Sequence, residues 1–387
     1  MNPVLETKLN DARALITKCI GKNGVHASDS RYKNQCWTRD FCIATSHVLA
    51  TDAVISNPQI IKQQLLELAN RQLENGKIPI LYLDDVRVFL LEKIEKSIEK
   101  GKMSFMLKRY LDGKFELENL TPHTRDSEVL YIITLCEFLL SESASALTDV
   151  EYKKLSGSAL NALNYIKTIS TDKLILGADW RDVREDLNNK PVLTNACLLY
   201  KAYSMVYKKE ESLEIKKILN EKYYNGTYFV DYPGSDSFDI LGNALAILYD
   251  IADSTQTENI LNYVKSITTK FGVKMCETFL PPLNDEEDCI MIRDKAVVWP
   301  FVNGFMLLAM IHHAKKTQSI DIEKSDIDKK EKEKENWHDF AKIQFENWIC
   351  LDGFYEWYDI VNGKGYGSPN QIWSAALFLR VYKALYG

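Results

Sequence analysis

Apolar residues recur every three or four positions along most of this chain, whereas the strict alternation of apolar and polar residues that marks a β-strand is scarce. A repeat of about 3.6 residues places the apolar side chains on one face of an α-helix. The pattern predicts twelve helices, over residues 4–20, 38–50, 59–73, 125–142, 147–168, 191–207, 211–221, 239–252, 257–270, 299–316, 332–350 and 371–386. We therefore expect an all-α chain.

The links between these helices differ in length in a regular way. Links such as 142–147 and 207–211 are short. The long links carry most of the tryptophan, glycine and acidic residues: 21–37, 169–190, 222–238, 271–298 and 351–370. Helical hairpins arranged in a ring produce this alternation, with tight turns at one rim and functional loops at the other. We therefore predict an (α/α)6 toroid, a six-hairpin fold, formed by residues 1–387 as a single domain.

Two segments do not fit the ring and are interpreted as insertions. Residues 80–120 contain a charged helix from Glu92 to Lys100, followed by Asp112-Gly113 between flanking segments that alternate in polarity. Asp-Gly in that setting is a strong hairpin signal, so we predict a small β-hairpin near 102–118. Residues 315–335 are a run of mixed charge with few apolar residues, which is typical of a solvated loop.

Composition excludes several classes of protein. The chain of 387 residues is 46% hydrophobic and 26% charged, as in globular proteins, and its net charge of −6 supplies no basic stripe for nucleic acid. No stretch approaches the roughly 20 apolar residues that span a bilayer, and the first eight residues do not resemble a signal peptide. The eight cysteines are scattered and form no CxxC pair. We expect a cytoplasmic, reduced protein that binds neither nucleic acid nor membranes.

The first candidate for chemistry lies near the C-terminus. Glu356 stands among Tyr355, Trp357 and Tyr358, and a glycine-rich run at 363–367 follows. Aromatic faces stack on the apolar faces of sugars, and glycine lets backbone approach a ligand closely. The segment indicates a carbohydrate site, although a surface glutamate in an aromatic loop would give the same pattern.

The second candidate lies in the long 169–190 link, where Asp179, Trp180, Arg181, Asp182 and Arg184 precede an apolar helix. A neighbouring arginine holds a carboxylate ionised, whereas an apolar ring raises the pKa of a carboxyl group. Glycosidases need such a contrast, because one carboxylic acid protonates the leaving oxygen while the other carboxylate activates water or attacks. The alternative is a salt-bridge cluster at a helix N-terminus.

Two further segments place Arg-Asp at the start of an apolar helix. One contains Arg39 and Asp40 next to Trp37, and the other contains Arg125 and Asp126 after His123. The aspartates are either capping carboxylates, worth about 1 kcal/mol each, or acceptors for sugar hydroxyls. The presence of two such segments beside aromatic residues favours binding.

Taken in order, these segments resemble those of the (α/α)6-toroid glycosidases, the broad group of neutral and alkaline invertases, processing α-glucosidases and the amylo-1,6-glucosidase units of glycogen debranching enzymes. The segments that carry the resemblance are Trp37–Phe41, Asp126–Ile133, Trp180–Asp182, Lys190–Ala196, Phe238–Ile247, Val298–Pro300, Tyr355–Asp359 and Gln371–Ala376. No single motif is decisive for the resemblance. The common order of all the segments, from about residue 34 to the end of the sequence, is what makes it specific.

The resemblance implies that Asp182 is the general acid and Glu356 the general base of an inverting mechanism. Two positions depart from the family pattern: Thr194 stands where the invertases have glutamate, and Glu128 where they have glycine. The residues expected to bind substrate are Trp37, Arg39, Asp40, His123, Arg125, Asp126, Asp179, Trp180, Trp299, Trp357 and Trp373.

The resulting hypothesis is a cytoplasmic, inverting glycoside hydrolase that acts on an α-glucoside such as sucrose or a short oligosaccharide and needs no metal or cofactor. One alternative is a toroid that binds carbohydrate but has lost catalysis. A less favoured alternative is an α-toroid enzyme like the terpene cyclases, suggested by the acidic pair Asp84-Asp85. His312-His313 lacks a companion ligand at metal-binding spacing and is interpreted as structural.

Overall fold

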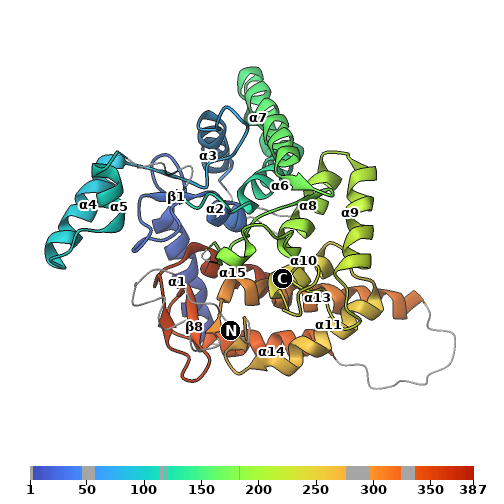
Figure 1. Cartoon of the computed structure of the whole chain (residues 1–387). Coiled ribbons are helices and arrows are strands. Elements are labelled where there is room, and N and C mark those ends of the chain that lie inside the picture. The colour runs from blue at the N-terminus through green and yellow to red at the C-terminus, as the bar shows by residue number, and fades with distance from the viewer. Residues whose placement is uncertain are drawn as a thin grey trace.

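The computed structural model describes residues 3–45, 57–113, 117, 120–182, 184–275, 297–323 and 336–387. Helices dominate and surround a common centre (Figure 1). Among the described residues, no helix combines the length and the apolar character needed to cross a membrane.

Six helices form an inner ring. They are α2 (Thr38–Thr45), α6 (Asp126–Leu140), α8 (Leu193–Met205), α10 (Ile240–Leu248), α13 (Pro300–Glu323) and α15 (Ile372–Tyr386). Each packs against the next in this order, and α15 packs against α2, which closes the ring. Helix α10 is buried continuously from Ile240 to Ile247, as expected for a helix covered on all sides.

Six outer helices cover this ring: α1 (Pro3–Cys19), α3 (Pro58–Asn70), α7 (Asp149–Thr168), α9 (Lys209–Lys222), α11 (Ser254–Ile267) and α14 (Trp337–Ile349). They are amphipathic, and α11 buries Thr257, Ile260, Leu261 and Val264, one stripe at helical spacing. Each outer helix precedes an inner helix in the chain. Each of the twelve predicted helices thus coincides with a described helix, and the (α/α)6 toroid is confirmed. Residues 46–50 and 332–335 of two predicted helices lie outside the described part of the chain.

The insertion between α3 and α6 differs from its prediction. It contains α4 (Val86–Glu99) and α5 (Phe105–Leu111), two helices that project from the ring (Figure 1). The β-hairpin predicted near 102–118 is wrong, because Ser104 caps α5 by accepting from the Leu107 N–H, and Gly113, with φ of 67°, follows the helix end. Asp-Gly serves a helix C-terminus as well as a hairpin turn, because glycine tolerates a positive φ in both.

The 315–335 segment also differs in part from its prediction. Residues 315–323 continue α13 and are not a loop. The remainder, residues 324–335, lies outside the described part of the chain.

Short strands occupy the long links. They are β1 (Gln35–Trp37), β2 (Leu81–Leu83), β3 (Ser170–Thr171), β4 (Leu174–Ile175), β5 (Thr268–Thr269), β6 (Gly272–Val273), β7 (Val297–Val298), β8 (Trp357–Asp359) and β9 (Gly365–Tyr366). The pairs β1–β2, β3–β4 and β5–β6 and the sheet β7–β8–β9 are all antiparallel. In the described part of the chain, 3-10 turns also lie at Glu142–Ala146 and Glu185–Leu187. The strands fix the links that lead into the inner helices.

Candidate active site

The starts of the inner helices meet at one rim of the ring. Arg39 and Asp40 lie in the first turn of α2, Asp126 begins α6, and Gln371 immediately precedes α15. Side chains from these starts contact one another directly: Arg39 binds Asp126, and Gln371 binds Asp40. The ring therefore gathers polar residues that are far apart in the sequence.

Arg39 holds two carboxylates of this rim. Its Nε donates to Asp126 Oδ2 at 2.5 Å and its Nη2 to Asp126 Oδ1 at 3.2 Å, in a buried bidentate pair. Its Nη1 lies 3.8 Å from Asp182 Oδ2. Both oxygens of Asp126 thus accept from Arg39, so this carboxylate orients the guanidinium and is not a simple helix cap.

Asp182 has a carboxyl group with a raised pKa. Burial raises the pKa of its carboxyl group to about 6, against the opposing effect of Arg39, and the negative charges of Asp126 and Asp179 raise it further. A carboxyl group in this range holds a proton in mildly acidic solution and releases it readily near neutrality, which is what acid catalysis requires.

Glu356 is held by the backbone around it. The Ser368 N–H donates to Glu356 Oε2 at 2.9 Å, and the Glu356 N–H donates to the Ser368 carbonyl at 2.9 Å. Gly367 has φ of 74°, and a Cβ built there would lie 2.5 Å from Glu356 Oε2. Glycine is required at 367 both for its conformation and for this close approach.

Tyr32 lies beside Glu356. Its hydroxyl donates to Glu356 Oε1 at 3.5 Å. Burial holds the pKa of Tyr32 well above 10, and the charges of Glu356, Asp182 and Asp40 add to this effect. One phenol therefore lies within electrostatic reach of all three carboxyl groups, including the predicted acid and base.

Asp40 is set up to remain protonated. Burial raises the pKa of its carboxyl group to about 8; Arg39 opposes this shift and Glu356 adds to it. Gln371 Nε2 donates to Asp40 Oδ1 at 2.8 Å. A protonated carboxyl group can accept on one oxygen and donate from the other, a combination suited to a sugar hydroxyl.

Aromatic rings near the starts of α13 and α15 pack together with Trp180. Trp180 and Trp299 meet edge to face with centroids 5.1 Å apart, and Phe301 stacks on Trp373 at 4.3 Å. The indole N–H groups of Trp180, Trp299 and Trp373 are buried without a hydrogen-bond partner among the described residues. Buried indole N–H groups usually have a partner, so these donors suit ligand hydroxyls.

Two other tryptophans of the prediction have separate surroundings. Trp37 is half-buried, meets the edge of the Tyr32 ring with centroids 6.1 Å apart, and donates to Gln35 Oε1. Trp357 is buried in β8 and stacks on Tyr366 of β9 at 4.7 Å. Trp37 therefore lies beside the candidate site, whereas Trp357 packs within the hairpin that carries Glu356.

Asp179 belongs to a buried ionic cluster. Arg181 donates from Nε to Asp179 Oδ1 at 2.9 Å and from Nη2 to Asp179 Oδ2 at 2.7 Å. Arg181 also donates to both oxygens of Asp231 and lies 3.6 Å from Asp239 Oδ2. Burial raises the pKa of Asp179, but Arg181 outweighs it and the pKa falls below its usual value. This cluster fixes the link that carries Asp182.

His123 and Arg125 lie beside the same link. The Ala178 N–H donates to the His123 carbonyl, and the Arg125 N–H donates to the Ala178 carbonyl, at 2.9 Å each. The His123 side chain is exposed and that of Arg125 is half-buried. Through these backbone hydrogen bonds both residues hold the link that carries Asp182. Binding of substrate by their side chains stays a prediction.

The sequence analysis missed Tyr32 and the partners of Arg181. Tyr32 lies in the long 21–37 link without any motif around it, and only the fold brings it to Glu356. Asp231 and Asp239 precede α10. Their position before an inner helix was the sequence feature that could have indicated a place near the site.

Comparisons with known proteins bear on the fold. Neither a family model nor a curated protein matches the sequence. A glycosidase of known structure aligns over 99% of this chain and 97% of its own, with a TM-score of 0.57 and 10% identity, and a variant of a glycosidase in complex with glucose aligns over the same shares with a TM-score of 0.56. A GH63 mannosylglycerate hydrolase from Thermus thermophilus, in complex with Tris and D-glycerate, aligns over 98% of this chain and 100% of its own, with a TM-score of 0.58 and 11% identity. The chain thus has the (α/α)6-toroid fold of the GH63 glycosidases, which confirms the resemblance at the level of the fold.

Proposed function

We propose that the protein is an inverting glycoside hydrolase in which Asp182 is the general acid and Glu356 the general base. The observation that carries the proposal is the pair of carboxyl environments at one rim. Burial raises the pKa of Asp182 to about 6, whereas backbone N–H and Tyr32 donors hold Glu356 in place. We take the carboxyl group with the raised pKa as the acid, and the carboxylate held by hydrogen-bond donors as the base.

The order of the ring supports this pairing. Asp182 lies in the link before α8 and Glu356 in the link before α15, and these two helices are three places apart in the closed ring of six. Links from opposite sides of the ring face each other across its axis. An inverting pair needs carboxyl groups roughly 6.5–9.5 Å apart, so that a water molecule fits between the base and the sugar.

In the proposed reaction, Asp182 gives its proton to the glycosidic oxygen as the bond from this oxygen to the anomeric carbon breaks. Glu356 takes a proton from a water molecule, whose oxygen bonds to the anomeric carbon from the opposite face. Proton exchange with solvent then restores both carboxyl groups. Arg39, Asp40 and Asp126 bind hydroxyls of the terminal sugar, and Trp37 and Trp299 present their rings to it.

The proposed substrate is an α-glucoside such as sucrose or a short oligosaccharide. Two proteins of the same fold support a small carbohydrate ligand, one a glycosidase in complex with glucose and the other a hydrolase of mannosylglycerate. The second candidate function is a binding protein without catalysis, because the aromatic rings and the Arg39–Asp126 pair suit binding alone.

The terpene-cyclase alternative rests on the acidic pair Asp84-Asp85, and both residues have partners within the protein. Asp84 accepts from the Lys22 and Asn23 N–H groups and pairs with His26, and Asp85 caps α4 by accepting from the Arg87 N–H. Both carboxylates thus have structural partners, which favours the glycosidase proposal.

The test is hydrolysis of a panel of α- and β-glucosides by the purified protein, with proton NMR of the first anomer released. Inversion of an α-glucoside gives β-glucose first. Release of α-glucose first would contradict the inverting mechanism. Binding of sugars without hydrolysis of any glycoside would favour the binding protein, and the Glu356→Gln variant provides the inactive control.

A further inference from the structure

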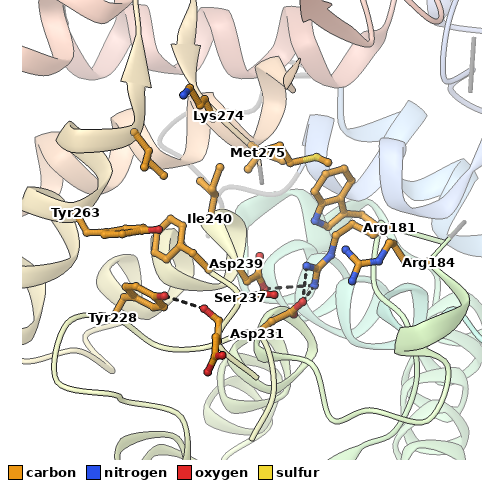
Figure 2. A pocket seen from close by; sticks show the side chains of 15 residues that line it. Arg181, Arg184, Tyr228, Asp231, Ser237, Asp239, Ile240, Tyr263, Lys274 and Met275 are labelled. Carbon is orange, nitrogen blue, oxygen red and sulfur yellow. Dashed lines mark hydrogen bonds and ion pairs between the residues drawn. The ribbon is translucent and has the colours of Figure 1, made fainter. Parts of the chain in front are cut away.

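The links that carry the proposed acid and the proposed base are fixed by different means. Figure 2 shows Arg181, the residue before Asp182, directed at Asp231 and Asp239 beside a cavity. This ionic cluster holds the link of the acid. The link of the base Glu356 is held in addition by a residue from the opposite end of the chain, in the N-terminal helix α1.

That residue is Lys8, whose side chain is buried. Its Nζ donates to the Leu351 carbonyl at 2.5 Å and to the Gly353 carbonyl at 2.8 Å, and it lies 4.7 Å from the centre of the Phe354 ring. These three residues belong to the link between α14 and Glu356. Lysine is almost never fully buried unless it is paired, so the two carbonyl groups and the aromatic ring define the position of this side chain.

Burial of the Lys8 ammonium group is costly. It lowers the pKa of Lys8 to about 8, although Asp352, Asp11 and Cys350 act electrostatically in the opposite direction. An unbranched apolar side chain of the same length would avoid this cost, but it would donate no hydrogen bond to the two carbonyl groups. A lysine at this position is therefore explained by its hydrogen bonds and not by packing.

The hydrogen bonds of Lys8 continue toward Glu356 through Tyr358. The Tyr358 hydroxyl donates to the Gly353 carbonyl at 3.0 Å, and the Tyr355 N–H donates to this hydroxyl at 3.1 Å. The Gly353 carbonyl thus accepts from Lys8 on α1 and from Tyr358 on β8. Glu356 follows Tyr355 directly, so this network fixes the backbone that enters Glu356.

The other side of Glu356 is held by Ser368, whose N–H donates to the carboxylate and whose carbonyl accepts from the Glu356 N–H. Removal of the Lys8 ammonium group leaves this contact in place and loosens the approach to Glu356 from α14. Displacement of a reacting group by about 1 Å can lower a rate about 100-fold. The rate at which Glu356 activates water is therefore sensitive to the bonds that Lys8 makes.

We propose that Lys8 is a positioning residue for Glu356. By holding the Leu351 and Gly353 carbonyl groups, it keeps the carboxylate of the base aligned with the water molecule that attacks the sugar. The proposal rests on the glycosidase function and deepens it. Helix α1 carries none of the residues expected to bind substrate, yet through Lys8 it takes part in setting the rate.

The first test is kinetic. Lys8→Met keeps an unbranched side chain and removes the donor, so we expect kcat to fall about tenfold with little change in KM, because the residues proposed to bind the sugar are unaltered. Lys8→Arg keeps a charged donor and should recover most of kcat. Tyr358→Phe removes the other donor to the Gly353 carbonyl and should lower kcat in the same way.

Leu15→Ala is the control for a loss of stability alone. Leu15 is buried about two turns further along α1, so its truncation opens a cavity without touching the bonds of Lys8. It should lower the melting temperature and leave kcat unaltered at temperatures below the transition.

A second measurement needs no hydrolysis. Hydrogen–deuterium exchange is followed at the N–H groups of Tyr355 and Glu356 without substrate. Faster exchange there in Lys8→Met than in the wild type and Leu15→Ala supports the positioning role even if the wild type hydrolyses no glycoside, in which case the proposed function alone fails. Unaltered exchange at both N–H groups would overturn the proposal, as would an equal loss of kcat in Leu15→Ala or a rise in KM without a loss of kcat.

Discussion

The Arg39→Met substitution removes the positive charge between Asp126 and Asp182 and keeps an unbranched side chain. At the observed separation of 3.8 Å, Coulomb's law gives about 4 kcal/mol for an effective dielectric constant of about 20. The Asp182 side chain is 21% exposed, and screening by water reduces this to about 2 kcal/mol, or about 1.5 pKa units. We expect the pKa of Asp182 to rise from about 6 by about this amount.

The assay is the pH dependence of kcat/KM on a hydrolysed glucoside. The acid must be protonated to act, so activity falls as pH rises through the pKa of Asp182. In Arg39→Met this falling limb should move from near pH 6 toward higher pH. In Asp126→Asn it should move to lower pH, because the charge of Asp126 raises the pKa of Asp182. The absolute rates fall in both variants, since sugar contacts are lost, but the position of the limb does not depend on them.

The double variant Arg39→Met/Asp126→Asn is the control. Removing one partner of a buried ion pair lowers the free energy of unfolding by about 3–5 kcal/mol, because the other charge is left buried and unpaired. Arg39→Met should therefore melt at a lower temperature than the double variant, in which both charges are absent. The limb of the double variant should lie between those of the single variants. An unchanged limb, or one moved to lower pH in Arg39→Met, would refute the assignment of Asp182 as the acid under the control of Arg39.

Further predictions follow from the roles proposed for the other residues of the site. Asp182→Asn should abolish hydrolysis with little loss of stability. Asp179→Asn weakens the buried pair with Arg181, so it should lower the melting temperature but lose less activity. The reverse ranking of the two variants would exchange the roles of the two aspartates. The pKa of Asp40 is about 8 in the folded protein and near 4 in the unfolded chain. The contribution of Asp40 to stability is therefore lost as the pH rises between these two values. Asp40→Asn should accordingly increase the melting temperature more at pH 8 than at pH 5. Glu356→Gln should abolish hydrolysis but keep calorimetric sugar binding, and wild-type hydrolysis should survive EDTA because carboxyl acid–base chemistry needs no metal.

The fold could be predicted from the sequence because the buried residues of each helix in a toroid recur at helical spacing. Inner helices such as α10 are apolar on every side, and outer helices such as α11 have one apolar stripe, so both differ clearly from the loops. The hairpin prediction failed at Asp112-Gly113 because the same dipeptide ends a helix, and the choice depended on Ser104, whose capping bond begins α5. Local turn chemistry alone does not distinguish these outcomes.

The candidate site was predictable only where residues carry a local signal. Asp182 and Glu356 were found because each stands among aromatic or charged neighbours in its own segment. Tyr32 stands between Arg31 and Lys33 but belongs to no recognisable motif, and its importance arises from a contact with Glu356 across 324 positions of the chain. Long-range pairing of this kind leaves no trace in a single sequence.

Closure of the ring is what assembles the site. The Lys8 Nζ of α1 donates to the Leu351 and Gly353 carbonyls at 2.5 Å and 2.8 Å, and the Ile372 N–H donates to the Ala27 carbonyl at 2.9 Å. These bonds join the first hairpin to the last, and this seam holds Glu356 next to Tyr32 and Asp40. Asp182 reaches the same rim from the third hairpin through Arg39. Asp182 and Arg39 lie in the first half of the chain and Glu356 lies in the second, so the contacts of both carboxyl groups are complete only once the sixth hairpin has packed against the first.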